Sequence, residues 1–463
     1  MPISPSHVSL IKCENYDAGI IKAALSRSFE LLGFNKDNPL RSLINPGDHV
    51  VLKPNWIREN HQINPNEWES VITHPSIITA VLKLVLSTLQ GKGKILITDG
   101  PQTDSSFRKI LEHMNVDSWL KMGREHGIAI EVLDLREDEW ISKGEIIVER
   151  NKLSGDPKGS VVVDLQVKSA FLGKQVPPLG YGGADYKAHE TTWAHSEGRN
   201  LYKVSRSVIE GDVFINLPKM KTHRKAGITV SMKNLVGINT YKNYLPHHSE
   251  GTPLQGGDQF STHSTKTITE HTIVSKLKKL WARYPSIAKY FIPVRAVGRK
   301  IFGDSSDVIR SGNWYGNDTL WRMVLDLNRI LLYANSDGTL RERGLFKAKR
   351  YLSIVDGIIA GEGNGPVAPD KVTAGILMAG VNPLAVDCVA AKLMGFDYRK
   401  IPCLSEAFKL FDYPIADFNY DDIRVLSDNK AWCTFLKDVS CIDTYKFRPA
   451  PGWVGHIEEG GCS

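Results

Sequence analysis

Hydrophobic and polar positions along the chain predict helices and buried strands in alternation. Residues 16–33 and 73–93 have apolar positions at helical spacing and end at glycine, with Thr73 expected as an N-cap. Apolar runs that finish in polar or glycine residues are typical of buried strands. Strands alternating with helices at this spacing favour an α/β protein with mostly parallel sheets covered by helices. The remaining predicted elements of the first third are strands at 47–56, 94–101 and 128–135 and a helix at 104–125.

The change from an apolar run to a polar tip recurs later, at 211–223, 351–366 and 374–396, and the last segment continues into a helix. In open α/β sheets, ligands bind beyond the carboxyl ends of the strands. The polar residues that follow these runs are therefore expected to gather at one site. They are Lys53, Asn55, Asp99, Lys219, Lys221, Asp356, Glu362 and Asp387.

The alternation breaks between about 240 and 316. Residues 265–303 have a helical pattern, and from 266 to 300 nine Lys and Arg stand against one acidic residue, a net charge of +8. Such a segment either lies on an anionic membrane surface or presents a solvated face. The pattern divides the chain into an N-terminal α/β part of the core (1–145), a middle part with a lysine-rich segment (146–240), a basic helical insertion (241–316), a C-terminal α/β part of the core (317–430) and a tail (431–463). The α/β parts are expected to form a single composite core, and the end of the tail, 450–463, is expected to be a surface strap or disordered.

The composition limits the classes of protein to which this chain can belong. With 463 residues, 42% hydrophobic and 24% charged, the chain has the make-up of a globular protein, and its net charge of +7 is only a weak sign of anionic partners. The six cysteines include no C-x-x-C pair, so no iron–sulfur cluster or structural zinc is expected. The N-terminus lacks a signal-peptide pattern, and no run approaches the ~20 apolar residues of a spanning helix. We expect a cytoplasmic protein with reduced thiols, with peripheral membrane association as an open alternative.

The segment 216–237, NLPKMKTHRKAGITVSMKNLVG, contains several cations and no acidic residue. Lys219 and Lys221 alternate as in a strand, so both point to one side, with Met220 opposite. Two such lysines repel each other unless an anion or a carboxylate lies between them. A predicted helix start containing Lys233 and Asn234 follows, and helix N-termini attract anions. The segment therefore predicts an anion site, with a solvated loop as the alternative.

Further side chains are candidates for chemistry, each with a structural alternative. Asp99 precedes a glycine and could instead cap a turn, and His74 could be part of a helix cap. Asp387 lies in the first turns of a helix and is a candidate ligand for a hard divalent cation such as magnesium. Asn364 stands among glycines that leave room for a ligand. Two polar loops add His195, Glu197, His247, His248 and Asp258 as candidates for substrate contact.

The sequence lacks the motifs of several enzyme and ligand-binding classes. There is no Gly-Lys-Ser/Thr phosphate loop, no dinucleotide fingerprint and no serine elbow. The basic residues form no recognisable nucleic-acid-binding module, so no nucleic acid is expected as a partner.

The phrases VLKPNW, THPSII, ITDGP, NLPKMKTH, VSMKNLVG, DGIIAGEGNGP and NPLAVDCVAAKLMGFD resemble the family called domain of unknown function 362, over roughly residues 47–397. Many members carry a ferredoxin-like cysteine module and are described as iron–sulfur-centre proteins, but this chain lacks that module. The loop YLPHHSEGTPLQGGD looks like the branch associated with surface-polysaccharide biosynthesis. More remotely, the strand-end lysines and histidines are similar in layout to nickel-pincer lactate racemases, which is a likeness of fold alone.

These features together favour an enzyme that acts on a small anionic metabolite, such as a phosphorylated or nucleotide-linked sugar, with the reaction left open. Two alternatives are a redox or racemase-like enzyme with an external metal or iron–sulfur partner, and a membrane-surface scaffold based on 265–303. The expected substrate-binding residues are Lys53, Asn55, Lys219, Lys221, Lys233, Asn234 and Asn364, the expected catalytic residues are His74, Asp99, His223, Asp356 and Glu362, and the expected metal ligand is Asp387.

Overall fold

A ten-stranded sheet forms the centre of the computed structural model, which describes residues 3–143, 146–183, 187–261, 311–341, 349–409 and 412–460, except for the side chains of 142–148. The basic segment 265–303 lies outside the described residues. The strand order is β16-β1-β15-β14-β10-β2-β3-β4, with β11 paired to β14 and β12 paired to β11. The strands are β1 (His7–Lys12), β2 (His49–Pro54), β3 (Lys94–Asp99), β4 (Ala129–Asp134), β10 (Val213–Leu217), β11 (Lys219–His223), β12 (Gly227–Thr229), β14 (Arg350–Glu362), β15 (Asp370–Gly380) and β16 (Arg424–Leu426).

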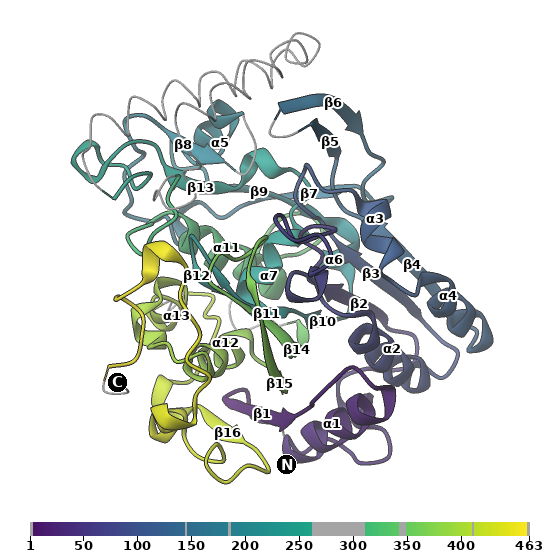
Figure 1. Cartoon of the computed structure of the whole chain (residues 1–463). Helices are drawn as coiled ribbons and strands as arrows, with labels where there is room; N and C mark the ends of the chain where they lie inside the picture. The colour runs from purple at the N-terminus through teal and green to yellow at the C-terminus, as the bar shows by residue number, and fades with distance from the viewer. Residues whose placement is uncertain are drawn as a thin grey trace.

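The sheet is parallel over most of its width. Strands β14, β10, β2, β3 and β4 run in one direction, whereas β15 is antiparallel to both of its neighbours. The parallel strands come from the N-terminal, middle and C-terminal parts of the chain, and Figure 1 shows them as one continuous sheet. The predicted mostly parallel α/β architecture is confirmed.

Two hydrophobic layers cover the sheet, and the alternation of side chains along β2 shows how. Val50 and Leu52 pack on one face, in the cluster that includes α1 (Ala18–Leu31) and α2 (Pro75–Leu89). Val51 packs on the other face, in the cluster that includes α11 (Leu320–Tyr333) and α12 (Pro383–Leu393). Successive strand residues point to opposite faces, so a run buried at every position must be covered on both (Figure 1).

Local signals set where the helices begin. Pro75 occupies the first turn of α2, and the N-cap is His74 rather than the expected Thr73. The ring Nδ1 of His74 accepts a hydrogen bond from the Ser76 amide at 3.2 Å. Thr73 instead donates to the Leu217 carbonyl at 2.6 Å and so ties α2 to β10.

The helix predicted at 104–125 is two helices, α3 (Phe107–Glu112) and α4 (Val116–Glu125). The first helix begins after its N-cap Ser106, and the residues between the two helices include Asn115, the N-cap residue of α4. A new helix start leaves backbone amides without intrahelical partners, which other groups must satisfy. The spacing of apolar residues carries no information about this, so it does not show the break.

Smaller elements fill the middle of the chain and surround the sheet. Among them, α7 carries two of the predicted site residues. The smaller elements are β5 (Asp138–Lys143), β6 (Ile146–Lys152), β7 (Ser160–Asp164), β8 (Tyr181–Gly183), α5 (Ala188–Ala194), β9 (Leu201–Ser205), α6 (Arg206–Glu210), α7 (Ser231–Asn234), β13 (Pro246–Ser249) and α13 (Pro402–Ser405). Three two-stranded sheets are formed by β5–β6, β7–β9 and β8–β13.

The tail packs onto the body of the protein. Trp432, Trp453 and Ile457 are buried, and the Trp453 ring nitrogen donates to the Arg224 carbonyl at 2.8 Å. Cys13, Cys388, Cys403 and Cys433 are free thiols, but Cys441 is disulfide-bonded, so the expectation of reduced thiols is wrong there. Of the helices in the described residues, none is long and apolar enough to span a membrane.

Candidate functional site

The ends of β2 and β3 bring Lys53 and Asp99 together as a buried ion pair. The Lys53 Nζ lies 2.7 Å from Asp99 Oδ1 and also donates to Asn234 Oδ1 at 3.2 Å. The other Asp99 oxygen accepts the Trp56 amide hydrogen at 2.7 Å. Burial lowers the pKa of Lys53, and the charge of Asp99 opposes that shift. The charge of Lys53 is therefore balanced inside the protein.

A second buried ion pair joins β11 to β14. Lys219 Nζ lies 2.6 Å from Asp356 Oδ2, and both side chains are fully buried. Asp356 also accepts hydrogen bonds from the Tyr16 hydroxyl and the His74 amide, each at 2.9 Å. Burial and the charge of Asp356 raise the pKa of Tyr16 well above its ordinary value. The carboxylate thus unites the N-terminal segment, the start of α2 and two strands.

Lys221 is buried without a carboxylate. Its Nζ donates to Asn55 Oδ1 at 3.3 Å and to the Val71 carbonyl. Burial, together with the charges of Lys219 and Lys233, lowers the pKa of Lys221 well below that of an ordinary lysine. Lys219 and Lys221 therefore need no shared anion between them, because each has partners of its own.

A second group of basic side chains comes from β11, the 224–226 turn, α7, the short 3-10 helix Lys242–Tyr244 and β13. We call it the cation cluster, because the charges of its lysines act on one another and on its histidines. Its lysines differ in their partners. Lys242 donates to the Gly100 carbonyl at 2.8 Å, and Lys225 donates to the Ser311 carbonyl. Lys233, only 8% exposed, has no hydrogen bond or ion pair among the described residues. The cluster consists of Lys225, Lys233, Lys242, His223 and His247.

Electrostatics within the cation cluster disfavours the charged form of its members. Burial and the charges of Lys242, Lys225 and Lys53 lower the pKa of Lys233 to about 7. Burial and the charge of Lys233 lower the pKa of His247 to about 3 and that of His223 well below its ordinary value. At neutral pH both rings are therefore neutral, and Lys233 titrates.

The two neutral histidines expose opposite hydrogen-bonding groups. His223 Nδ1 accepts the Lys225 and Ala226 amide hydrogens at 3.0 and 3.2 Å, which places the ring hydrogen on Nε2. His247 Nδ1 lies 3.0 Å from the Leu245 carbonyl and must donate to it, which leaves Nε2 as an acceptor. The cation cluster therefore combines an amine, one ring donor and one ring acceptor.

His74 lies beside the Lys219–Asp356 ion pair and is not part of the cation cluster. Its ring stacks on Tyr16 at a centroid distance of 3.6 Å and on Trp68 at 5.5 Å. Burial lowers its pKa to about 4. With Nδ1 used as the cap of α2, Nε2 faces Glu69 at 3.8 Å. This is the structural alternative that the sequence left open for His74.

Three predicted site residues lie apart from these groups. Glu362 forms an ion pair with the exposed Arg448 at 2.7 Å, and the side chain of Asn364 has no hydrogen bond within the described residues. Asp387 accepts the Ser231 and Met232 amide hydrogens at 2.7 and 2.9 Å. Burial raises the pKa of Asp387 to about 7. The helix start that was expected to attract an external anion already holds this internal carboxylate.

Within the described ranges, no group of three or more His, Cys, Asp or Glu side chains is arranged to hold a metal ion. Asp387, the predicted ligand, uses both carboxylate oxygens on backbone amides. A metal role for it stays a prediction.

The polar loops contribute one residue to the cation cluster, His247. His195 is buried among aromatic rings and bonds to the Tyr244 carbonyl at 3.0 Å, and Asp258 bonds to Thr319 at 2.5 Å and to the Ser249 amide. Glu197 pairs with Arg199 at the surface. These contacts hold the loops in place.

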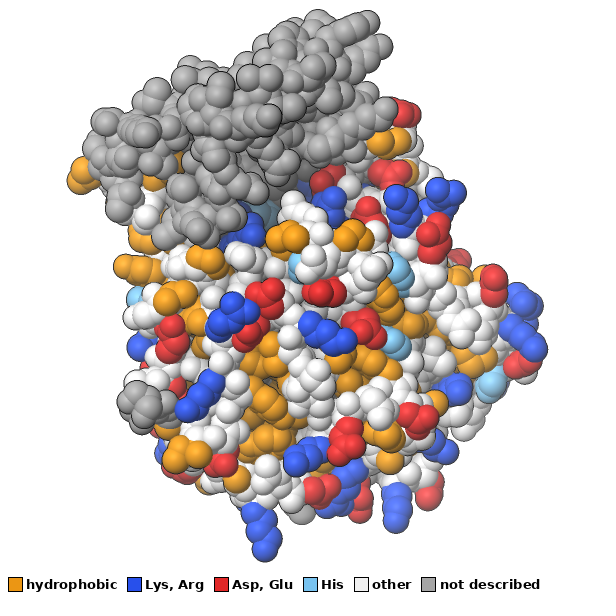
Figure 2. Space-filling view, in the orientation of Figure 1, with side chains coloured by type: hydrophobic (Ala, Val, Ile, Leu, Met, Phe, Trp, Pro, Cys, Tyr) orange, Lys and Arg blue, Asp and Glu red, His pale blue; other side chains and the backbone are white. Residues whose placement is uncertain are grey.

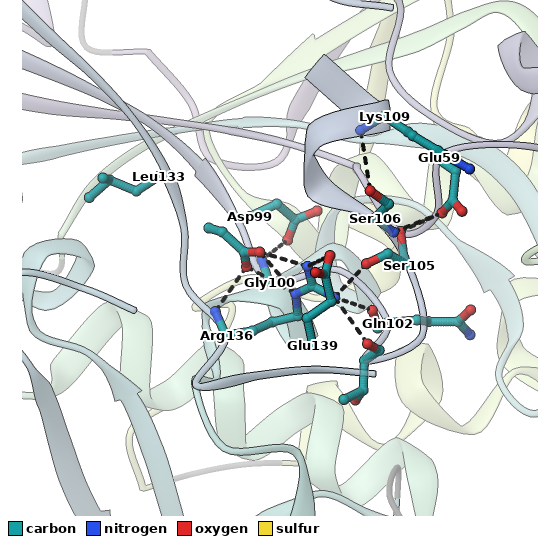
Figure 3. Close-up of polar contacts among 12 residues, drawn as sticks. Glu59, Asp99, Gly100, Gln102, Ser105, Ser106, Lys109, Leu133, Arg136 and Glu139 are labelled. Atoms are coloured by element: carbon teal, nitrogen blue, oxygen red, sulfur yellow. Dashed lines mark hydrogen bonds and ion pairs between the residues drawn. The ribbon is translucent and has the colours of Figure 1, made fainter. Parts of the chain in front are cut away.

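Sequence reasoning missed Tyr16, Lys242 and Arg136. Arg136 is buried, pairs with Asp134 at 2.6 Å and donates to the carbonyls of Gln102 and Ser105 at 2.7 Å each. Figure 3 shows Arg136 inside the loop that follows β3. The Gly100 carbonyl of this loop accepts a hydrogen bond from Lys242. Arg136 follows a predicted strand, so the strand-end rule applied elsewhere would have found it. Tyr16 and Lys242 carry no such signal.

The basic side chains of the two ion pairs and of the cation cluster lie inside the protein rather than at its surface. On the face drawn in Figure 2, basic and acidic side chains of the described residues are intermingled and form no continuous basic patch. The buried lysines, in contrast, gather at the ends of the parallel strands. The charge concentrated in 216–237 is therefore mostly interior.

The chain is similar in sequence to a protein family and to a protein of Synechocystis sp.. A family described as domain of unknown function (DUF362) matches residues 50–154 and 139–392. The thylakoid-associated protein sll1697 of Synechocystis sp. is 21% identical over 409 residues, which covers 88% of this chain and 81% of that protein.

Two solved structures are more distant. A protein from Thermotoga maritima has 10% identity and a TM-score of 0.32 over 78% of this chain, and the lactate racemase apoprotein from Thermoanaerobacterium thermosaccharolyticum has 10% identity and a TM-score of 0.34 over 83%. The chain spans only 55% and 56% of their respective lengths. Likeness at this level carries no functional argument.

Proposed function

We propose that this chain, which belongs to the DUF362 family, is an enzyme that binds a small anionic metabolite in the cation cluster. One observation carries the proposal. Lys233 is buried beside other lysines and has no partner among the described residues, whereas Lys53 and Lys219 are each paired with a carboxylate. A bound anion would supply the negative charge that the cluster lacks.

In this proposal the substrate is a phosphorylated or nucleotide-linked sugar, as in surface-polysaccharide biosynthesis. Lysine ammonium groups bind phosphate as point charges, and Lys233, Lys225 and Lys242 offer them from different elements. The neutral rings of His223 and His247 would exchange protons with the substrate.

The remaining predicted residues would shape the site around that cluster. The two ion pairs hold the strand ends through internal bonds, and Lys221 joins them to the loop before α2. Residues proposed for this framework are Lys53, Asn55, His74, Asp99, Lys219, Lys221, Asn234 and Asp356.

Thermal unfolding with glucose 6-phosphate tests the proposal. The phosphate ester should raise the Tm of the full chain in a concentration-dependent way, and glucose at the same concentration should not. Lys233→Met should lose most of this rise. Lys121→Met, at a lysine with a 71% exposed side chain, is the matched control and should keep it. An equal rise in wild type and Lys233→Met contradicts the proposed site.

We also propose peripheral membrane association through residues 265–303. The +8 charge between 266 and 300 and the printed name of the thylakoid-associated relative support this proposal. Sedimentation with vesicles that contain anionic lipid should carry the wild-type chain down and leave a 265–303 deletion in solution. Equal sedimentation of both would refute it.

A further inference from the structure

We propose that Lys233 is a nucleophile that forms a Schiff base with a carbonyl group of the anionic substrate. This inference rests on the proposed function and narrows it, because the substrate must then carry an aldehyde or ketone together with its negative charge. Sugar phosphates with an open-chain carbonyl and 2-oxo acids belong to this class.

The contrast with the other buried lysines supports this role. A lysine nitrogen that donates to carboxylates or carbonyls is held in place by those acceptors and is not free to approach a carbonyl carbon. Lys233 has no such acceptor within the described residues. The partners of the others are Asp99 for Lys53, Asp356 for Lys219, the Val71 carbonyl for Lys221, the Gly100 carbonyl for Lys242, three carbonyls at the end of α6 for Lys349 and Glu459 for Lys392.

The surroundings of Lys233 also raise the neutral share of its amine. Burial and nearby lysine charges lower its pKa to about 7, against 10.5 for an ordinary lysine. At pH 7 the neutral share of Lys233 is therefore roughly a thousandfold larger than that of an exposed lysine. Desolvation and neighbouring cations are the established means of activating a lysine for attack on a carbonyl.

The histidines complete the step. The Lys233 Nζ lone pair forms a bond to the carbonyl carbon while the C=O π pair moves to oxygen. The Nε2 hydrogen of His223 bonds to that oxyanion, and His247 Nε2 takes the proton that the nitrogen loses. His247 then gives this proton to the oxygen, which becomes a hydroxyl. His247 carries the second amine hydrogen to the same oxygen, and the nitrogen lone pair forms the C=N bond as water leaves. The balance is one amine and one carbonyl giving one imine and one water.

Trapping with pyridoxal 5′-phosphate, a phosphorylated aldehyde, tests the inference on the full chain. After borohydride reduction at pH 7, peptide mass mapping should find the adduct on Lys233, with at least tenfold less on the exposed Lys121. Inorganic phosphate should suppress this adduct, and pyridoxal, which lacks the phosphate, should give at least tenfold less of it.

Variants and the thermal assay separate the two proposals. Lys233→Arg keeps the charge but lacks the amine, so it should lose the adduct and keep stabilisation by phosphate, whereas Lys121→Arg should behave as wild type. Adducts confined to exposed lysines, with phosphate still raising the Tm, would overturn the Schiff base and leave the proposed function standing. No adduct and no rise in Tm would overturn both. Phosphate protection in the wild type keeps the test decisive if Lys233→Arg does not fold.

Discussion

At the scale of single residues, the site lysines differ in what holds them, and stability should report the difference. Lys219→Met leaves the Asp356 charge buried without its cation, so a loss of about 3–5 kcal/mol in unfolding free energy is expected. Urea denaturation measures it. The double variant Lys219→Met/Asp356→Asn removes both charges and should recover part of the loss. A single variant as stable as wild type would show that the pair is not buried as described.

Lys233 should give the opposite sign, with a defined pH dependence. Its pKa is lowered from 10.5 to about 7, so the unfolded chain binds more protons between these values, and wild-type stability gains from this group as the pH rises through that window. Lys233→Met should therefore be more stable than wild type at pH 7. Its advantage should shrink by about 2 kcal/mol by pH 9, at ~1.4 kcal/mol per pH unit.

Denaturation of both proteins at the two pH values checks this, because the other titrating groups cancel in the difference. Lys121→Met, at an exposed lysine, should show no such dependence. An advantage of Lys233→Met that is equal at pH 7 and pH 9 would mean that the folded protein does not lower the pKa of Lys233.

At the scale of elements, the turn after α7 must approach β3 closely. A Cβ atom at Gly237 would lie 1.7 Å from Asp99 Oδ1 and 2.9 Å from Lys53 Cε. Gly237→Ala therefore has to displace the first ion pair, and a loss of about 1–3 kcal/mol is expected from overpacking alone. Thermal or urea unfolding measures it. Gly460→Ala, where nothing lies within 4 Å, is the control and should change stability little. Equal stability of both variants would contradict the close approach.

The elements also show how far sequence reasoning reaches. Apolar runs with polar ends located β2, β3, β10 and β14, because buried parallel strands leave that pattern and their carboxyl ends share one edge. The pairings of Lys53 with Asp99 and Lys219 with Asp356 depend on register across distant strands, which the pattern does not contain. Spacing likewise showed α2 but not that His74, rather than Thr73, caps it.

At the scale of the whole molecule, the parts inferred from the sequence share one sheet. β10 from the middle part lies between β2 from the N-terminal part and β14 from the C-terminal part. Strand order across such separations does not follow from local periodicity, so the sequence predicts a single composite core without giving the order in which its strands pair. The packing of the tail does not follow from local periodicity either, because Trp453 contacts Arg224, which is distant in the sequence.

The tail provides the prediction at this scale. Trp453 is 1% exposed, its ring nitrogen bonds to Arg224, and its ring faces Gly227 before α7. Trp453→Ala should lower the unfolding free energy by about 3–5 kcal/mol. In a thermal scan, the lower Tm should appear as a shift of the main transition. The exposed Trp193, at 50%, offers a control that should cost far less. A separate early transition would show that the tail unfolds on its own.

We propose that Lys233, which has no partner among the described residues, marks an anion-binding site. Titration calorimetry of inorganic phosphate into the full chain at pH 7 tests it most directly, with wild type and Lys233→Met compared in the same low-salt buffer. The account predicts saturable binding to wild type and at least tenfold weaker binding to Lys233→Met. Equal affinity in the two proteins, or no binding to wild type, would contradict it.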